Sequence, residues 1–164
     1  MKESDKMSNQ ILATRIDNRL VHGQVGMSWA NTIGANLIVV ANDKVANDPV
    51  QQSLMEMVLS ETIGIRFFTI EKTIRIIAKA SPKQKILLVV KTPQDALRLL
   101  EGGVELKSIN VGNMHFAEGK RRIHPLVSVT DDDVETFRKI NAMGVQLEIR
   151  GIPNEKSVDL MTLI

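Results

Sequence analysis

The sequence predicts a three-layer α/β fold, in which a mostly parallel sheet carries helices on both faces. Short apolar runs alternate with helical patterns from Ile11 onward, and most of these runs are continuous. A continuous apolar run is typical of a strand that is buried on both faces of a parallel sheet. Strand–helix alternation over about six units favours right-handed crossovers between parallel strands.

The apolar runs are the predicted strands. In chain order they are Ile11–Ala13, Leu37–Ala41, Ile65–Phe68, Ile86–Val90, Ile109–Val111 and Val127–Val129. Val145–Ile149 differs from them, because apolar and polar residues alternate there with period two. That pattern indicates a strand with one solvent-exposed face, so we expect an antiparallel strand at the edge of the sheet in this segment.

Helix-start signals lie between the strands. Asp48 followed by Pro49 is a typical N-cap and first helical position. Apolar residues follow at helical spacing and form the predicted buried stripe: Val50, Leu54, Met57 and Val58. The methionines of this segment, Met55 and Met57, are expected to fill the core.

Two later helices carry similar signals. Thr92 before Pro93 repeats the opening, and Gly102–Gly103 can end that helix. Thr130 precedes Asp131–Asp133, whose carboxylates favour the positive end of a helix. The buried stripe of this last helix is Val134, Phe137 and Ile140. In such folds, chemistry is located at the carboxyl ends of the strands.

The chain has 164 residues, which suits one domain, and we expect residues 11–164 to form it. Residues 1–10 are polar and of mixed charge. They are predicted to be a disordered lead or an expression-vector remnant, and not a signal peptide. No apolar run approaches the roughly 18 residues that span a bilayer.

The composition excludes several kinds of function. Four Phe, one Trp and no Tyr cannot form a base-stacking platform, and a net charge of +2 gives no reason to expect a nucleic-acid partner. The absence of Cys excludes disulfides, thiolate metal sites and cysteine nucleophiles, and it agrees with a reducing cytoplasm. Motifs for a catalytic triad, a metal hydrolase and nucleotide binding are missing. We therefore expect no metal and no cofactor.

The densest polar cluster is RIDNRLVHGQV, which follows the first predicted strand directly. Its chemistry-bearing residues are Arg15, Asp17, Arg19 and His22, and a helix is expected to begin near Gly23. An imidazole supplies a nucleophile, two guanidiniums can neutralise phosphoryl oxygens, and backbone N–H groups at a helix start attract an anion. The pattern therefore predicts a phosphoryl acceptor. The alternative is a solvated histidine beside a surface ion pair.

Other polar residues have less support. Asp17 can hold either Arg19 or the imidazole in place. His115 lies in another strand-end loop, and for it a structural or incidental role is favoured. Next to His124 lies the basic run Lys120–Arg122, which is typical of a solvated face but also suits an acidic partner protein.

RIDNRLVHGQV closely resembles the active-site segment of the enzyme IIB subunits of the mannose/fructose/sorbose class of the bacterial sugar phosphotransferase system. The resemblance extends from Ile11 to Ile164, because residues 99–120 resemble the family's second signature and SVDLMTLI resembles its C-terminus. Residues 41–69 are most similar to the N-acetylgalactosamine/galactosamine-type members. The family fold, a mostly parallel α/β sheet with one antiparallel edge strand, agrees with the fold predicted from the residues.

The resemblance implies a phosphoryl carrier, a protein-phosphohistidine–sugar phosphotransferase. The family's phosphohistidine falls on His22, which would accept a phosphoryl group on Nδ1 from a phosphohistidine of the partner subunit IIA. Arg19 matches the arginine that steadies this group, and Arg15 and Asp17 match the flanking motif positions. Phosphate contacts are expected at Gly23 and Gln24. The loop that would border the site contains Asn110, Gly112, Asn113 and Met114.

The same resemblance implies where the phosphoryl group goes. It would pass to a sugar, N-acetylgalactosamine or galactosamine, that enters through the membrane subunits IIC and IID. The protein is then expected to be cytoplasmic and to associate with the inner face of the membrane through those subunits. The sequence leaves open whether the protein forms a homo-oligomer.

Two other functions remain open on the residues alone. A regulatory module would use the fold to dock partners, with His22 phosphorylated as a signal. A small-ligand-binding domain would use Asp43, near the end of the second strand, as a receiver-like acceptor. The latter is disfavoured, because the first strand end places Asp17 among arginines and lacks the paired acids that hold a metal.

Overall fold

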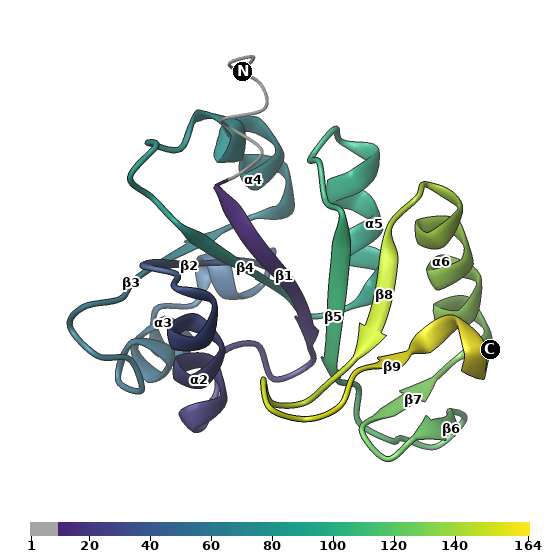
Figure 1. Ribbon diagram of the computed structural model, residues 1–164. Helices are drawn as coiled ribbons and strands as arrows, with labels where there is room; N and C mark the ends of the chain where they lie inside the picture. Colours follow the sequence, from purple (N-terminus) through teal and green to yellow (C-terminus); the bar gives the residue numbers. More distant parts are fainter. Residues whose placement is uncertain (1–9) are drawn as a thin grey trace.

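A seven-stranded sheet runs through the centre of the protein in the order β3-β2-β4-β1-β5-β8-β9 (Figure 1). The computed structural model describes residues 10–164, so residues 1–9 of the predicted lead lie outside the described part. Gln10 is buried, and its carbonyl accepts a hydrogen bond from the Ile86 N–H. None of the described helices is long and apolar enough to cross a membrane.

Most strands of this sheet follow the apolar runs, but β1 continues four residues past the predicted Ile11–Ala13, so that Arg15 and Asp17 lie in the strand, and β9 was not predicted. Their bounds are β1 Ile11–Asp17, β2 Leu37–Ala41, β3 Gly64–Phe68, β4 Ile86–Val90, β5 Ser108–Asn113, β8 Gln146–Ile149 and β9 Val158–Asp159. Neighbouring strands are parallel throughout, except for β8 and β9, which are antiparallel. The predicted fold class is therefore confirmed, including an antiparallel strand at one edge.

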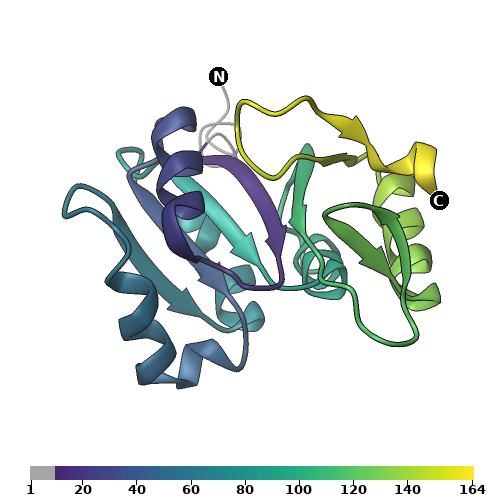
Figure 2. The same cartoon turned by 90° about the horizontal axis from the view of Figure 1, so that it is seen from below.

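Helices cover both faces of the sheet (Figures 1 and 2). Their bounds are α2 Gly23–Ile33, α3 Pro49–Glu56, α4 Ile70–Ile76, α5 Pro93–Glu101 and α6 Asp131–Ala142. One core cluster packs α2 and α3 against β2 and β4, and a second packs α4, α5 and α6 against the opposite face. The predicted caps Asp48, Thr92 and Thr130 are all confirmed, because each side-chain oxygen accepts a backbone N–H of the first helical turn.

The position of the edge strand differs from the prediction. Val145–Ile149 was expected at an antiparallel edge, but β8 pairs in parallel with β5, and β9 covers its outer side. Leu147 and Ile149 are buried while Gln146 is exposed. The period-two pattern thus correctly predicts that one face of β8 is exposed. It carries no information about strand direction or order, because the same alternation suits any strand covered by helices on a single face.

Val127–Val129 forms a strand as predicted, but outside the main sheet. This strand, β7, pairs antiparallel with β6 (Arg121–His124) in a separate two-stranded sheet. A single bridge from Met114 to Val127 joins the hairpin to the end of β5. The hairpin therefore lies just beyond the carboxyl end of that strand.

The apolar stripe of α3 points away from the core. Val50, Leu54 and Met57 are 68%, 53% and 79% exposed, whereas Met55 is buried. The core assignment is thus confirmed for Met55 and wrong for Val50, Leu54 and Met57, whereas Val58 is half-buried against the core. Helical spacing identifies residues that share a face, but only the packing of neighbouring elements decides which face is covered.

Candidate functional site

The loop between β1 and α2 places the predicted cluster at the carboxyl end of the central strand. Leu20 has a φ of 59°, and among the described non-glycine residues no other φ is positive. Its N–H donates to the Asp17 carbonyl over 2.8 Å, which closes a tight turn. The side chains of Leu20 and Val21 are buried in the core beside α2. Because a positive φ is unfavourable for leucine, burial of these side chains has to offset the strain of this turn.

Asp17, the last residue of β1, is the buried acceptor at the start of this loop. It is 1% exposed. Its Oδ1 accepts the Arg19 backbone N–H over 2.9 Å and lies 3.7 Å from Arg19 Nε. Its Oδ2 accepts from Arg15 Nη2 over 3.2 Å. The sequence left two partners open for Asp17, Arg19 and the imidazole of His22. In the described part of the chain, Asp17 bonds to arginine residues and not to the imidazole.

Arg15 lies behind Asp17 and uses its donors on protein acceptors. Nη1 donates to Asn110 Oδ1 over 2.6 Å and to the Arg150 carbonyl over 3.2 Å. The residue is 4% exposed, and this burial lowers the pKa of the guanidinium below its usual value. The expectation that two guanidiniums face a phosphoryl group is therefore not met by Arg15. Arg19, whose side chain is 39% exposed, is the guanidinium that remains accessible.

Gly112 makes room for the Arg15 guanidinium. A Cβ at this position would lie 2.0 to 2.2 Å from three guanidinium atoms of Arg15. Asn113, one residue further, accepts the Asn18 N–H on its carbonyl and donates from Nδ2 to Asn18 Oδ1. The end of β5 thus holds both Arg15 and the loop after β1. Met114 was also expected to border the site, but its side chain is buried in the core.

Replacing Gly112 with Ala is expected to push the Arg15 guanidinium out of its bonds and to destabilise the fold by about 1–3 kcal/mol. Urea denaturation of both proteins measures this change. Arg15→Lys provides the matched background, because its smaller head leaves room for the added methyl group. Gly112→Ala should cost less in that background, and strictly additive costs would contradict the proposed clash.

His22 is the N-cap residue of α2, in extended conformation and without a side-chain capping bond. It is half-buried, and its Nε2 is buried without a hydrogen-bond partner in the part of the chain that the structure describes. Gly23 and Gln24 begin the helix and are exposed. A side-chain oxygen caps each of α3, α4, α5 and α6. At the N-terminus of α2, no side chain of the cap residue accepts a hydrogen bond from the backbone N–H groups of the first turn.

The remaining predicted candidates occupy other positions. His124 Nδ1 accepts the Leu126 N–H, so this histidine shapes the β6–β7 turn. His115 is exposed, and its Nε2 lies 3.4 Å from Asn113 Nδ2. Asp43 accepts the Ile70 N–H, which lowers the pKa of the carboxyl, and it pairs with Arg98 over 3.0 Å. This arrangement supports α4 and gives no support to a receiver-like acceptor.

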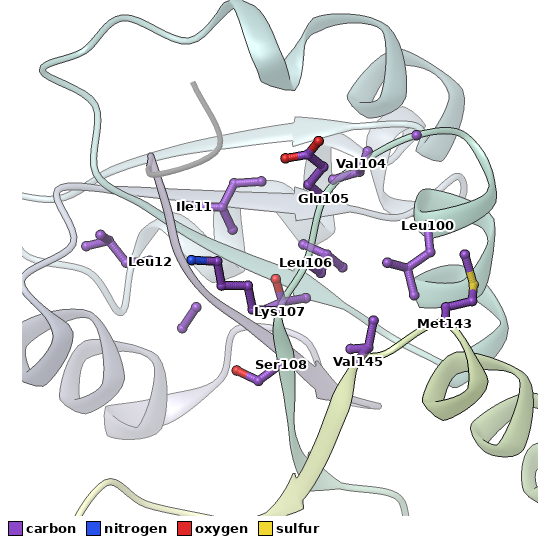
Figure 3. Close-up of a pocket in the computed structure, with 13 residues that line it drawn as sticks. Ile11, Leu12, Leu100, Val104, Glu105, Leu106, Lys107, Ser108, Met143 and Val145 are labelled. Atoms are coloured by element: carbon purple, nitrogen blue, oxygen red, sulfur yellow. The ribbon is translucent and has the colours of Figure 1, made fainter. Parts of the chain in front are cut away.

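Residues 10–164 contain no cluster of three or more acidic or histidine side chains that could hold a metal ion. A cavity of about 600 Å³ lies at the opposite end of the sheet from His22 (Figure 3). Its lining comes from the amino end of β1, from the end of α5 and the loop that leads into β5, and from the segment before β8, and includes Leu12, Leu106 and Val145. None of the predicted site residues lines it.

Comparison with known proteins gives consistent matches. Residues 11–164 match the family model described as the PTS system sorbose subfamily IIB component. The chain is 53% identical over 154 residues to the N-acetylgalactosamine-specific phosphotransferase enzyme IIB component 2 of Escherichia coli (strain K12), covering 94% of this chain and 98% of that protein. It is 37% identical to the PTS system mannose-specific EIIAB component of the same organism, covering 92% of this chain and 47% of that protein.

A solved structure gives the same result. The crystal structure of the PTS system N-acetylgalactosamine-specific IIB component 1 from Escherichia coli superposes with a TM-score of 0.89. The two sequences are 54% identical, and the match covers 92% of this chain and 99% of that chain.

Proposed function

Because this chain belongs to the sorbose subfamily of phosphotransferase-system IIB components, we propose that His22 is the residue that carries the phosphoryl group. The observation behind this proposal is the position of His22 at the uncapped N-terminus of α2. A phosphoryl group on its ring meets the backbone N–H groups and the positive end of the helix dipole. Burial of Nε2 leaves Nδ1 as the nitrogen that attacks, with the proton held on Nε2.

Transfer takes place by in-line displacement: His22 Nδ1 attacks the phosphorus, and the bond between phosphorus and the donor nitrogen of IIA breaks on the opposite side. The transition state is loose, so the protein contributes position and charge stabilisation. Arg19 provides the accessible cation, and its backbone is fixed by Asp17. Arg15 does not contact the phosphoryl group. It holds Asp17, and Asn110 and Gly112 hold Arg15.

The relatives support the proposed partners. In the mannose-specific EIIAB component, a IIA part accompanies a segment that resembles this chain, which supports a IIA protein as the phosphoryl donor. The N-acetylgalactosamine-specific relatives support N-acetylgalactosamine or galactosamine as the sugar. Membrane subunits IIC and IID present this sugar, so the protein works at the inner face of the membrane.

The function is tested by reconstitution. The chain is incubated with phosphoenolpyruvate, enzyme I, the phosphocarrier protein and a matching IIA, and its intact mass is measured. We expect one acid-labile phosphoryl group, which membranes containing IIC and IID transfer to N-acetylgalactosamine but not to fructose. No phosphorylation by a IIA that is active on another IIB would contradict the carrier function. Phosphorylation without discharge to any sugar would favour the regulatory alternative.

The β6–β7 hairpin is expected to assist docking of the donor. Arg121 and Arg122 are exposed, and neither forms an ion pair with a residue of the described part. Beside them, Phe116 is 57% exposed and lies 5.6 Å from the Arg122 guanidinium. Exposed cations near a reacting group raise the rate of association with an acidic partner.

Replacing Arg121 and Arg122 together with Gln should raise the KM for phosphorylated IIA roughly 3-fold to 10-fold and weaken its salt dependence, with little change in kcat. Lys83→Gln with Lys107→Gln removes the same charge far from His22 and is the control. Equal effects of the two double variants would show that net charge acts, and not the hairpin.

A further inference from the structure

Trp29 lies in a buried position against two guanidinium groups. The Arg15 Cζ is 5.2 Å and the Arg150 Cζ is 5.0 Å from the centre of its ring. The ring is 3% exposed, and its Nε1–H donates to the Gly151 carbonyl over 2.8 Å. Trp29 thus ties the middle of α2 to a segment 122 residues away. Cation–π contacts strengthen when they are desolvated, so these contacts restrain both arginines.

Arg15 continues this connection toward the reacting loop. Its guanidinium bonds to Asn110, to the Arg150 carbonyl and to Asp17, so acceptors from three separate segments fix its plane. Asp17 in turn holds the backbone N–H of Arg19. A continuous path of contacts therefore joins Trp29, Arg15, Asp17 and Arg19.

Trp29 belongs to the helix that begins directly after His22. It lies seven residues after His22, which is the N-cap residue of α2. The helix start that carries His22 and the strand end that carries Asp17 are thus held against each other at Trp29. The hydrogen bonds of Arg15, Asp17 and Trp29 restrain this arrangement.

We propose that Trp29 is a positioning residue for phosphoryl transfer, which it supports by fixing Arg15 and thereby the loop that carries Arg19 and His22. This inference rests on the proposed function. The Arg150–Gly151 segment completes the arrangement by accepting from both Arg15 and Trp29. Small displacements of reacting groups lower rates strongly, so an effect is expected on kcat and not on donor affinity.

The first test separates positioning from core packing. Trp29→Leu keeps an apolar side chain but removes the ring and its N–H, whereas Trp29→Phe keeps a ring. Transfer from phosphorylated IIA should slow roughly 10-fold to 100-fold in Trp29→Leu with an unchanged KM, and less in Trp29→Phe. Leu99→Ala is the control, because Leu99 is fully buried in the core cluster on the other face. If Leu99→Ala, at a similar loss in melting temperature, slows transfer as much, the proposal is overturned.

The second test does not depend on transfer. In unphosphorylated protein, NMR follows hydrogen exchange of the Arg15 guanidinium protons and of the Arg19 amide proton. Trp29→Leu should accelerate exchange at both groups at least roughly 10-fold, and Leu99→Ala should leave them slow. Unchanged exchange in Trp29→Leu overturns the positioning role. If the wild type is not phosphorylated by IIA, but Trp29→Leu still accelerates exchange at Arg15 and Arg19, the proposed function is refuted and the link from Trp29 to Arg19 stands.

Discussion

Replacing His22 with Ala is expected to abolish phosphoryl acceptance and to leave the fold unchanged. The side chain makes no capping bond to α2, and its buried Nε2 has no partner among the described residues. Its removal therefore costs the helix no hydrogen bond, while the proposed nucleophile is lost. Intact-mass analysis after incubation with phosphorylated IIA measures acceptance, and far-UV circular dichroism and the melting temperature check the fold.

His115→Ala is the matched control for this variant. His115 is exposed and lies at the neighbouring strand end, where its Nε2 approaches Asn113. We expect it to accept phosphate like the wild type, because Asn113 keeps its bonds to Asn18 without the imidazole. Retained acceptance in His22→Ala together with loss in His115→Ala would move the phosphorylation site to His115.

Arg19→Ala is expected to slow transfer by roughly 10²-fold or more, because it removes the accessible cation near the phosphoryl group. The loop should persist, since Asp17 accepts the backbone N–H of residue 19 and not only its side chain. Single-turnover quench-flow with phosphorylated IIA gives the rate, and circular dichroism confirms the fold.

Arg19→Lys distinguishes charge from geometry. Lysine keeps the positive charge but lacks the planar fork that binds two phosphoryl oxygens, so its rate should fall between those of Arg19→Ala and the wild type. A rate for Arg19→Ala within twofold of the wild type would rule out charge stabilisation by Arg19. It would assign that task to the helix N-terminus alone.

Local signals explain which elements could be predicted. β2 and β4 are continuous apolar runs, and their predicted bounds coincide with the observed ones. The caps at Asp48, Thr92 and Thr130 act on N–H groups within three residues of themselves, so their effect can be read from the sequence. α4, β6 and β9 were not predicted, although Thr69 caps α4 in the same way.

Long-range packing explains the errors. The apolar residues of α3 share one helix face. No local signal shows that no other described element of the chain packs against this face. The direction of β8 depends on the crossover through α6, and its outer side is covered by β9, which follows a loop. Strand order and helix cover arise from contacts between distant segments, which a window of sequence does not contain.

The sequence by itself determined the order of the motif, from Arg15 to Gln24, its association with the first strand, and the family to which the chain belongs. Only the tertiary structure decided the separate tasks of the two arginines. Arg15 is buried because Asn110, Gly112, Trp29 and the Arg150 carbonyl surround it, and these groups come from other parts of the chain. Arg19 stays exposed because no such segment covers it. Two identical side chains in one motif thus differ in accessibility, since burial and hydrogen bonding to distant partners, and not residue type, set what each guanidinium can reach.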